Sequence, residues 1–228
     1  MLLHAGALVV MQVHYNLMHM PKPDRSRAVL RLLPAAGAGL IPLDTVLVPA
    51  PVELPCPGGA STGLCARSRA LADVQKKYGL TGGLIPAGLL YVCGKTLADY
   101  PQNVGNARDV STSCDRKVTR PVRIYGAAGH MHTRGFDIDV ELDPGTPRAQ
   151  TLLHIPHWSF HWQDSYYLAQ PVDAGPGDTI RVSCRFDNSP AAQPVLHGTQ
   201  LAPRYVVWGE GTTDEMCLGL LQVAARTP

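Results

Sequence analysis

The sequence lacks a strong charge of either sign. Its 228 residues carry 20 Lys and Arg against 18 Asp and Glu, a formal net charge of +2. No basic stripe interleaved with aromatics occurs, so we expect no nucleic-acid surface. No apolar run approaches the roughly 20 residues of a membrane helix, so we expect no membrane span. Hydrophobic residues make up 45% of the chain, which is enough for a sizeable buried core.

Several common signatures are missing as well. The chain has no GxGxxG, P-loop, nucleophile elbow or HExxH motif. Its six cysteines include no CxxC pair, which argues against a zinc knuckle. Their even number and their dispersal among Pro/Gly-rich loops favour disulfides and an oxidising compartment instead. The first residues do not show the pattern of a signal peptide. We therefore expect a piece of a longer protein that is secreted or otherwise extracytoplasmic.

Twenty prolines and 22 glycines are too many for a helical bundle and suit short strands joined by turns. Alternation predicts a half-buried strand at 6–17 and a second strand at 27–34, with a linker after it. One short helix is expected at 64–78, ended by Gly79. Further strands are expected within 88–93, 120–126, 136–145, 178–188, 204–211 and 216–223. The prediction is an all-β sandwich with one short helix.

The segment GHMHTRG at 129–135 places His130 and His132 one residue apart in a predicted strand. If the register is unbroken, both point to the same side as the aliphatic residues Val122 and Ile124. Two buried imidazoles without partners cost several kcal/mol, so they need hydrogen bonds or a metal. Satisfied core histidines are one alternative, but the small neighbours favour a metal. A carboxylate as third ligand would indicate iron or zinc, and a thioether would indicate copper.

Three motifs occur in order: MQVHY at 11–15, the HMH of 130–132, and GEGTTDEMCLG at 209–219. Together they resemble the copper type II ascorbate-dependent monooxygenases, which include dopamine β-monooxygenase and peptidylglycine α-hydroxylating monooxygenase. The resemblance implies two jelly-roll domains, each with one copper, and ascorbate as reductant. It implies His130, His132 and Met216 as the oxygen-activating site for a small-molecule substrate. It also implies His14 as one ligand of the three-histidine site that delivers an electron.

The resemblance covers only the later part of the family's catalytic core. It implies that 1–38 is the end of the N-terminal copper domain and that 39–228 is the C-terminal jelly-roll domain. The family's upstream His-His pair does not occur in this chain, so we expect a missing upstream domain. Peptidylglycine-acting members carry an Arg where Ala128 stands, and polar residues where Leu218 and Leu220 stand. A glycine-extended peptide is therefore a poor substrate.

The resemblance also implies a Cys184–Cys217 disulfide. The other four cysteines are expected to pair locally, as Cys56–Cys65 and Cys93–Cys114. The alternative, free buried thiols, conflicts with the oxidising compartment.

Other polar residues have competing interpretations. The segment with His154, His157, His161, Trp158 and Trp162 can bind a metal or line a substrate pocket. We expect it instead to cover an edge of the core with half-exposed histidines. Asp214 and Glu215 are expected to be exposed turn residues or to support a ligand, and Arg134 is expected to form a structural ion pair.

Three functions follow from these features. The first is a copper monooxygenase that hydroxylates an activated C–H bond with O2 and a reductant. The second is a copper-binding β-sandwich without hydroxylase activity. The third is a disulfide-stapled sandwich with a degenerate site.

Overall fold

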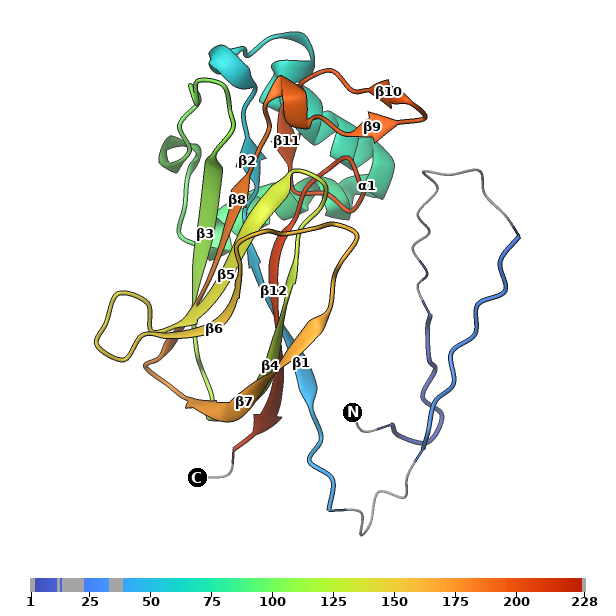
Figure 1. Cartoon of the computed structure of the whole chain (residues 1–228), viewed down its shortest axis with the longest axis vertical. Helices are drawn as coiled ribbons and strands as arrows, with labels where there is room; N and C mark the ends of the chain where they lie inside the picture. Colours follow the sequence, from blue (N-terminus) through green and yellow to red (C-terminus); the bar gives the residue numbers. More distant parts are fainter. Residues whose placement is uncertain (1–2, 12, 14–22, 33–38, 227–228) are drawn as a thin grey trace.

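The computed structural model describes residues 3–11, 13, 23–32 and 39–226. It consists mainly of two four-stranded antiparallel sheets packed face to face (Figure 1). The first has the strand order β1-β12-β4-β7 and the second β3-β8-β5-β6. The strands of the first sheet are β1 (Asp44–Ala50), β4 (Val122–His130), β7 (Ser165–Ala174) and β12 (Cys217–Ala225). Those of the second are β3 (Val110–Lys117), β5 (Gly135–Leu142), β6 (Gln150–Ile155) and β8 (Thr179–Phe186).

Short elements complete the fold. Two two-stranded pairs join β2 (Glu53–Leu54) to β11 (Val206–Val207), and β9 (Val195–Leu196) to β10 (Thr199–Gln200). Four 3-10 turns lie at Pro57–Gly59, Gly63–Cys65, Leu97–Asp99 and Pro190–Ala192. The predicted all-β sandwich with one helix is therefore confirmed.

The core lies between the inner faces of the two sheets. Alternate residues of each strand supply it, as period-2 patterning requires. From the first sheet come Val48, Ile124, Leu221 and Val223, and from the second come Ile138, Val140, Val182 and Phe186. Period-2 alternation thus accounts for these inward-facing residues.

The helix is longer than predicted. α1 spans Arg67–Val92, with a break at Gly79, whose φ of 73° and ψ of −173° are not helical. The predicted stop at Gly79 therefore falls at a real interruption, after which a second helical segment follows. The predicted strand at 88–93 is wrong. Short apolar runs do not distinguish strand from helix, and here Gly82, Pro86 and Leu90 are buried at a helical spacing of four.

All three expected disulfides are present. Cys56 pairs with Cys65, Cys93 at the end of α1 pairs with Cys114 on β3, and Cys184 pairs with Cys217. The last links β8 to β12, so it joins the two sheets through the core. Cys217, the second cysteine of this disulfide, directly follows Met216 in the sequence.

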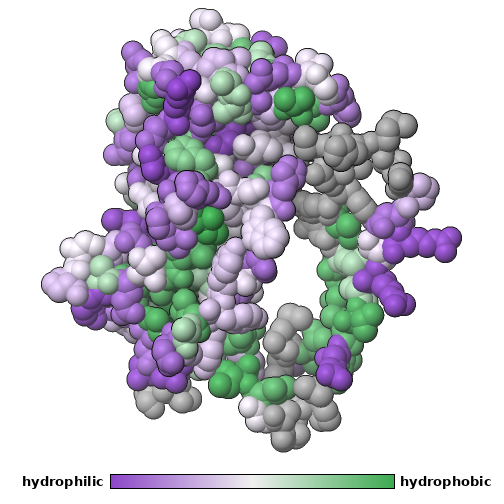
Figure 2. Space-filling model, in the orientation of Figure 1, coloured by the Kyte–Doolittle hydropathy of each residue, from purple (hydrophilic) through white to green (hydrophobic). Residues whose placement is uncertain are grey.

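The predicted N-terminal strands are not found among the described residues. Residues 7–11, 13 and 27–32 lie in no strand and are exposed. The rest of those two predictions, including His14, falls outside the described residues. Figure 1 draws the described residues 7–11 and 27–32 beside the sandwich rather than within a sheet, and Figure 2 shows hydrophobic side chains along this part of the chain. Strands without neighbours have no partners for their backbone groups and are marginal in water, which accounts for the difference.

None of the described helices is both long enough and apolar enough to cross a membrane.

Candidate metal centre

A β-bulge in β4 decides which way the histidines point. Ile124 pairs with Val223 and Gly126 with Gln222, so Tyr125 is an extra residue in the ladder. A bulge inverts the alternation beyond it. After Tyr125 the odd positions face the core: Ala127 and Met131 are fully buried. The expectation that both histidines share the side of Val122 and Ile124 is therefore wrong, because the register is broken. His130 lies on the outer face of the first sheet.

The two imidazoles lie next to each other at the end of β4. Their ring centroids are 5.1 Å apart and the planes are nearly perpendicular. His130 is partly exposed, whereas only 4% of His132 is accessible. The pair therefore joins one solvent-accessible imidazole to one buried imidazole.

Hydrogen bonds fix the tautomer of His132. Its Nδ1 lies 3.2 Å from the carbonyl oxygen of Asp214. A carbonyl oxygen can only accept, so Nδ1 carries the proton and Nε2 holds a lone pair. In a metal-ligating histidine, the ring nitrogen that does not bind the metal usually donates its N–H to such an acceptor. Burial, followed by the neighbouring His130, lowers the pKa of His132 to about 4. The ring is therefore neutral at physiological pH, as a ligand must be.

His130 is fixed in the same way by a residue that the sequence did not reveal. Its Nδ1 is 2.6 Å from Oε1 of Gln163, and Nε2 of Gln163 donates to the carbonyl of Phe160 at 2.8 Å. The second bond orients the amide, so its oxygen is the atom that faces His130. Nδ1 of His130 then donates, and Nε2 holds the lone pair. No motif marks Gln163, which is 33 residues from His130 in the chain.

Met216 directly precedes β12, the strand that pairs with β4. In that ladder Leu218 is paired with His130, so Met216 lies two residues before the partner of His130. The residue before it, Glu215, accepts a hydrogen bond from the backbone N–H of His132. Met216 is partly buried and packs against the core. Two imidazoles and a thioether are side chains suited to copper.

Glu215 fastens the two ligand-bearing segments together. Its carboxylate accepts the backbone N–H groups of His132 at 2.8 Å and of Arg134 at 2.6 Å. It is fully buried, which corrects the expectation of an exposed turn residue. Burial raises the pKa of Glu215 to about 7, although the N–H groups of Arg134, His132 and Met216 favour the carboxylate. The backbone of the HMH loop is thus bonded to the residue preceding Met216.

Asp214 is also buried, with 2% of its surface exposed. Its carboxylate accepts from Tyr78 Oη at 2.7 Å and from Arg204 Nη2 at 2.8 Å. Burial and this hydrogen bond raise the pKa of Tyr78. The same residue whose carbonyl holds His132 is therefore anchored to α1 through its side chain.

Arg134 has a structural role, but not as a simple ion pair. Its guanidinium is buried and donates to Asn188 Oδ1, to the carbonyl of Thr213 and to Gln193 Oε1, at 2.9 to 3.1 Å. Burial lowers the pKa of Arg134 to about 10. These bonds hold the 209–216 loop against the remainder of the domain.

The histidine- and tryptophan-rich segment packs beside the centre. Trp158 is buried and donates Nε1–H to the carbonyl of His132 at 3.2 Å, and the ring of Phe160 meets His132 edge-on at 6.1 Å. His154, His157 and His161 are exposed, as is 71% of Trp162. The expected cover over the core is thus provided by Trp158, while the histidines face solvent.

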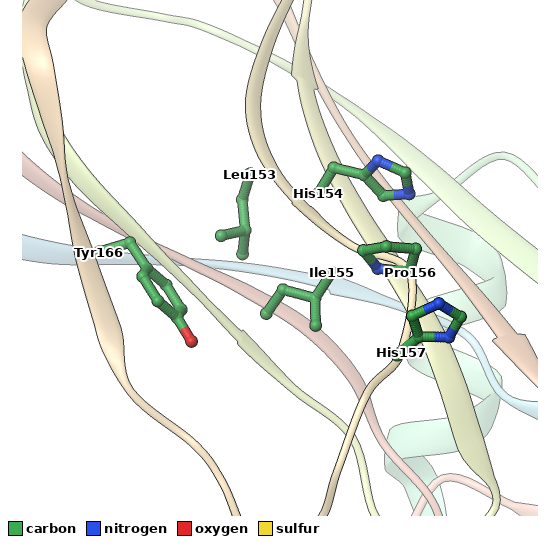
Figure 3. A pocket seen from close by; sticks show the side chains of 6 residues that line it. All are labelled: Leu153, His154, Ile155, Pro156, His157 and Tyr166. Carbon is green, nitrogen blue, oxygen red and sulfur yellow. The ribbon is translucent and has the colours of Figure 1, made fainter.

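A shallow pocket lies between the sheet edges formed by β6 and β7. It has a volume of about 270 Å³ and is lined by Leu153, His154, Ile155, Pro156, His157 and Tyr166. Figure 3 shows Leu153 and Ile155 directed toward Tyr166, while the ring of His154 turns away from it. The lining is mostly apolar, with Tyr166 Oη and the His157 ring as its polar groups.

A second set of candidate ligands lies on β5 and β6. Asp137, Asp139 and His154 hold ligand atoms within 4.8 Å of one another. Arg185 Nη1 also lies 3.8 Å from Asp137 Oδ2, so a cation already faces this group.

Comparison with family models decides the relationship. Residues 100–223, more than half of the chain, match the C-terminal domain of the copper type II ascorbate-dependent monooxygenases. The chain belongs to this family. No match was found among curated proteins. The family is copper-dependent and uses ascorbate. Its matched region contains His130, His132 and Met216.

The donor atoms fit copper. Both rings are held by their Nδ1–H groups, which leaves Nε2 as the ligand atom of each. The thioether of Met216, the residue after Glu215, is the type of soft donor that favours Cu(I). The three-histidine site cannot be described, because His14 lies outside the described residues.

Proposed function

We propose that this protein is a copper-dependent monooxygenase that hydroxylates an activated C–H bond of a small molecule, with O2 and a reductant such as ascorbate. The observation that carries the proposal is the pair of neighbouring imidazoles at His130 and His132, whose Nδ1 atoms are hydrogen-bonded so that each Nε2 is left as a ligand atom. Both imidazoles are pre-oriented through Nδ1. Copper bound there supplies the oxygen activation and the one-electron chemistry.

The chain's own residues supply geometry and access. His130, His132 and Met216 are the proposed ligands. The carbonyl of Asp214 and the amide of Gln163 hold the imidazoles, and the carboxylate of Glu215 fixes the loop between them. Because His130 lies on the outer face, a ligand can approach from solvent rather than through the core.

Two finer points belong to the same proposal. Residues 1–38 are the end of an N-terminal copper domain, with His14 a ligand of the electron-delivering site, and 39–228 form the oxygen-activating domain. The protein works outside the cytoplasm, which the three disulfides support.

Copper ligation can be tested by loading the purified chain with Cu(I) and recording X-ray absorption. We expect two imidazoles and one sulfur scatterer. Met216→Leu keeps the volume of a side chain that packs against the core, and it should remove the sulfur signal. The matched control is His157→Ala, which should change nothing. Absence of sulfur in the wild-type spectrum would contradict the assignment.

Catalysis is tested by oxygen consumption coupled to product formation, with ascorbate. Hydroxylation with water formation needs two electrons, and the second is proposed to come from the site that includes His14. We therefore expect slow turnover by the 228-residue chain and a large gain when an upstream domain with a His-His pair is supplied. Efficient turnover that is insensitive to His14→Ala would contradict the two-site mechanism.

A further inference from the structure

The segment 156–164, between β6 and β7, contacts both proposed ligands. Trp158 bonds the carbonyl of His132, the Phe160 ring meets the His132 ring, and Gln163 bonds His130. These three contacts come from six consecutive residues. The aromatic residues of this segment therefore have two roles: Trp158 packs against the core, and Trp158 and Phe160 contact His132.

Within this segment, Gln163 differs from the others because it is exposed and yet specifically oriented. Its amide has one oxygen and one NH2 group, and both are used: Oε1 faces His130 Nδ1 at 2.6 Å, and Nε2 donates to the Phe160 carbonyl at 2.8 Å. Reversing the amide would place NH2 against the imidazole N–H and oxygen against a carbonyl. The network therefore has one consistent arrangement.

We infer that Gln163 is the positioning residue for His130, setting its Nδ1–H tautomer and aiming Nε2 at the metal; this rests on the proposed copper site. His132 needs no such help from the segment's side chains for its tautomer, because Asp214 supplies a backbone carbonyl. The Nδ1 atoms of the two ligands thus have different acceptors: a main-chain oxygen that no substitution removes, and the side chain of an exposed glutamine. A substitution at Gln163 therefore removes the acceptor of His130 Nδ1 and leaves that of His132 in place.

The first test uses the apo protein and needs no copper. Long-range ¹H–¹⁵N spectra of the histidine rings report the tautomer of His130. We expect Nδ1–H in the wild type, a mixture with Nε2–H in Gln163→Ala, and recovery of Nδ1–H in Gln163→Glu, whose carboxylate accepts the same proton. Gln150→Ala, an exposed glutamine on β6, should leave the spectrum unchanged. An Nε2–H tautomer in the wild type overturns the inference.

The second test measures copper affinity by competition with a chelator. Loss of a group that supports a metal-bound histidine lowers affinity by about 10- to 100-fold, so we expect Gln163→Ala to bind at least tenfold more weakly. Gln163→Glu keeps an acceptor for Nδ1–H of His130 but loses the bond to the Phe160 carbonyl, so it should bind copper more tightly than Gln163→Ala, which a purely structural role would not produce. Unchanged affinity in Gln163→Ala overturns the inference while leaving the copper site intact. Copper affinity that is unchanged in His130→Ala would instead contradict the proposed function.

Discussion

Two groups of histidines lie within 32 residues of each other in the sequence, and the structure treats them differently. His130 and His132 have each Nδ1 hydrogen-bonded to a defined acceptor, and His132 is buried and neutral. His154, His157 and His161 are exposed on the edge strand β6 and the segment after it. The second group has more histidines, and carboxylates lie near His154, yet all three of its side chains are exposed.

The comparison shows that the number of imidazoles does not make a site. What distinguishes the first group is the support behind it: a buried carboxylate, a backbone carbonyl, and the pairing of β4 with β12. The predictions below test how much each support contributes, in order of decreasing effect.

The largest effect is expected from Glu215→Ala. It leaves the N–H groups of His132 and Arg134 buried without their acceptor, and breaking such a network costs about 3–5 kcal/mol of the free energy of unfolding. Glu215→Gln keeps one acceptor oxygen and should cost less. Urea denaturation of the apo protein measures both. A loss below about 1 kcal/mol in the alanine variant would show that the loop is held by other contacts.

The disulfide behind Met216 should come next. Replacing Cys184 and Cys217 together by serine removes a cross-link between residues 33 positions apart. The chain-entropy model predicts that this lowers the free energy of unfolding by about 3.7 kcal/mol. The same model gives about 2.6 kcal/mol for Cys56–Cys65, separated by 9 residues. Thermal unfolding of the two double variants should preserve that order. The reverse order would mean that loop closure does not govern the difference.

The free energy of unfolding should depend on pH because the buried imidazole of His132 binds a proton less readily in the folded chain than in the unfolded chain. The pKa of His132 is lowered to about 4, against an unfolded value near 6.5. As the pH falls from 6.5 to 4, the unfolded chain takes up a proton that the folded chain does not, so stability falls. The loss is about 2–3 kcal/mol. Glu215, whose pKa is raised to about 7, contributes the opposite slope as its folded form binds the proton first.

The two slopes can be separated by comparing urea unfolding of the wild type and of His132→Gln across this pH range. The variant should lose the acid sensitivity attributed to His132, and the two stability curves should converge toward low pH. Curves that stay parallel would mean that His132 is protonated equally in both states.

The smallest effect is expected in the second group. Replacing His154 and His157 by alanine removes exposed side chains, so the free energy of unfolding should change by no more than about 0.5 kcal/mol for each. Copper affinity at the proposed site should not change. If this pair of substitutions reduces copper binding as strongly as His132→Ala, the distinction between the two groups is wrong.

Much of the fold was predictable because its causes are local. The alternation in 136–145 and 178–188 matches β5 and β8, and Gly79 interrupts the helix where expected. The segment 88–93 was assigned wrongly because its apolar run fits either element, and only burial at 82, 86 and 90 shows the helical side. The strands at 6–17 and 27–34 have the right pattern, but no described residue pairs with them.

The sequence by itself determined the identity of the candidate ligands and the chemistry of their donor atoms. His130, His132 and Met216 are residue types with fixed ligand preferences, and the motifs around them carry the family relationship. The disulfide partners also followed, since separation along the chain and the family pattern constrain them.

Only the tertiary structure decided which way the ligands point and what holds them. One extra residue in the β4 ladder, at Tyr125, places His130 on the outer face instead of the core face. Side chains of a strand alternate between two faces, so a shift of one residue moves every following side chain to the opposite face. Gln163, Asp214 and Glu215 lie 33, 82 and 83 residues from the histidine groups that they bond. Hydrogen bonds across such separations depend on strand order and packing, and no local pattern in the sequence records them.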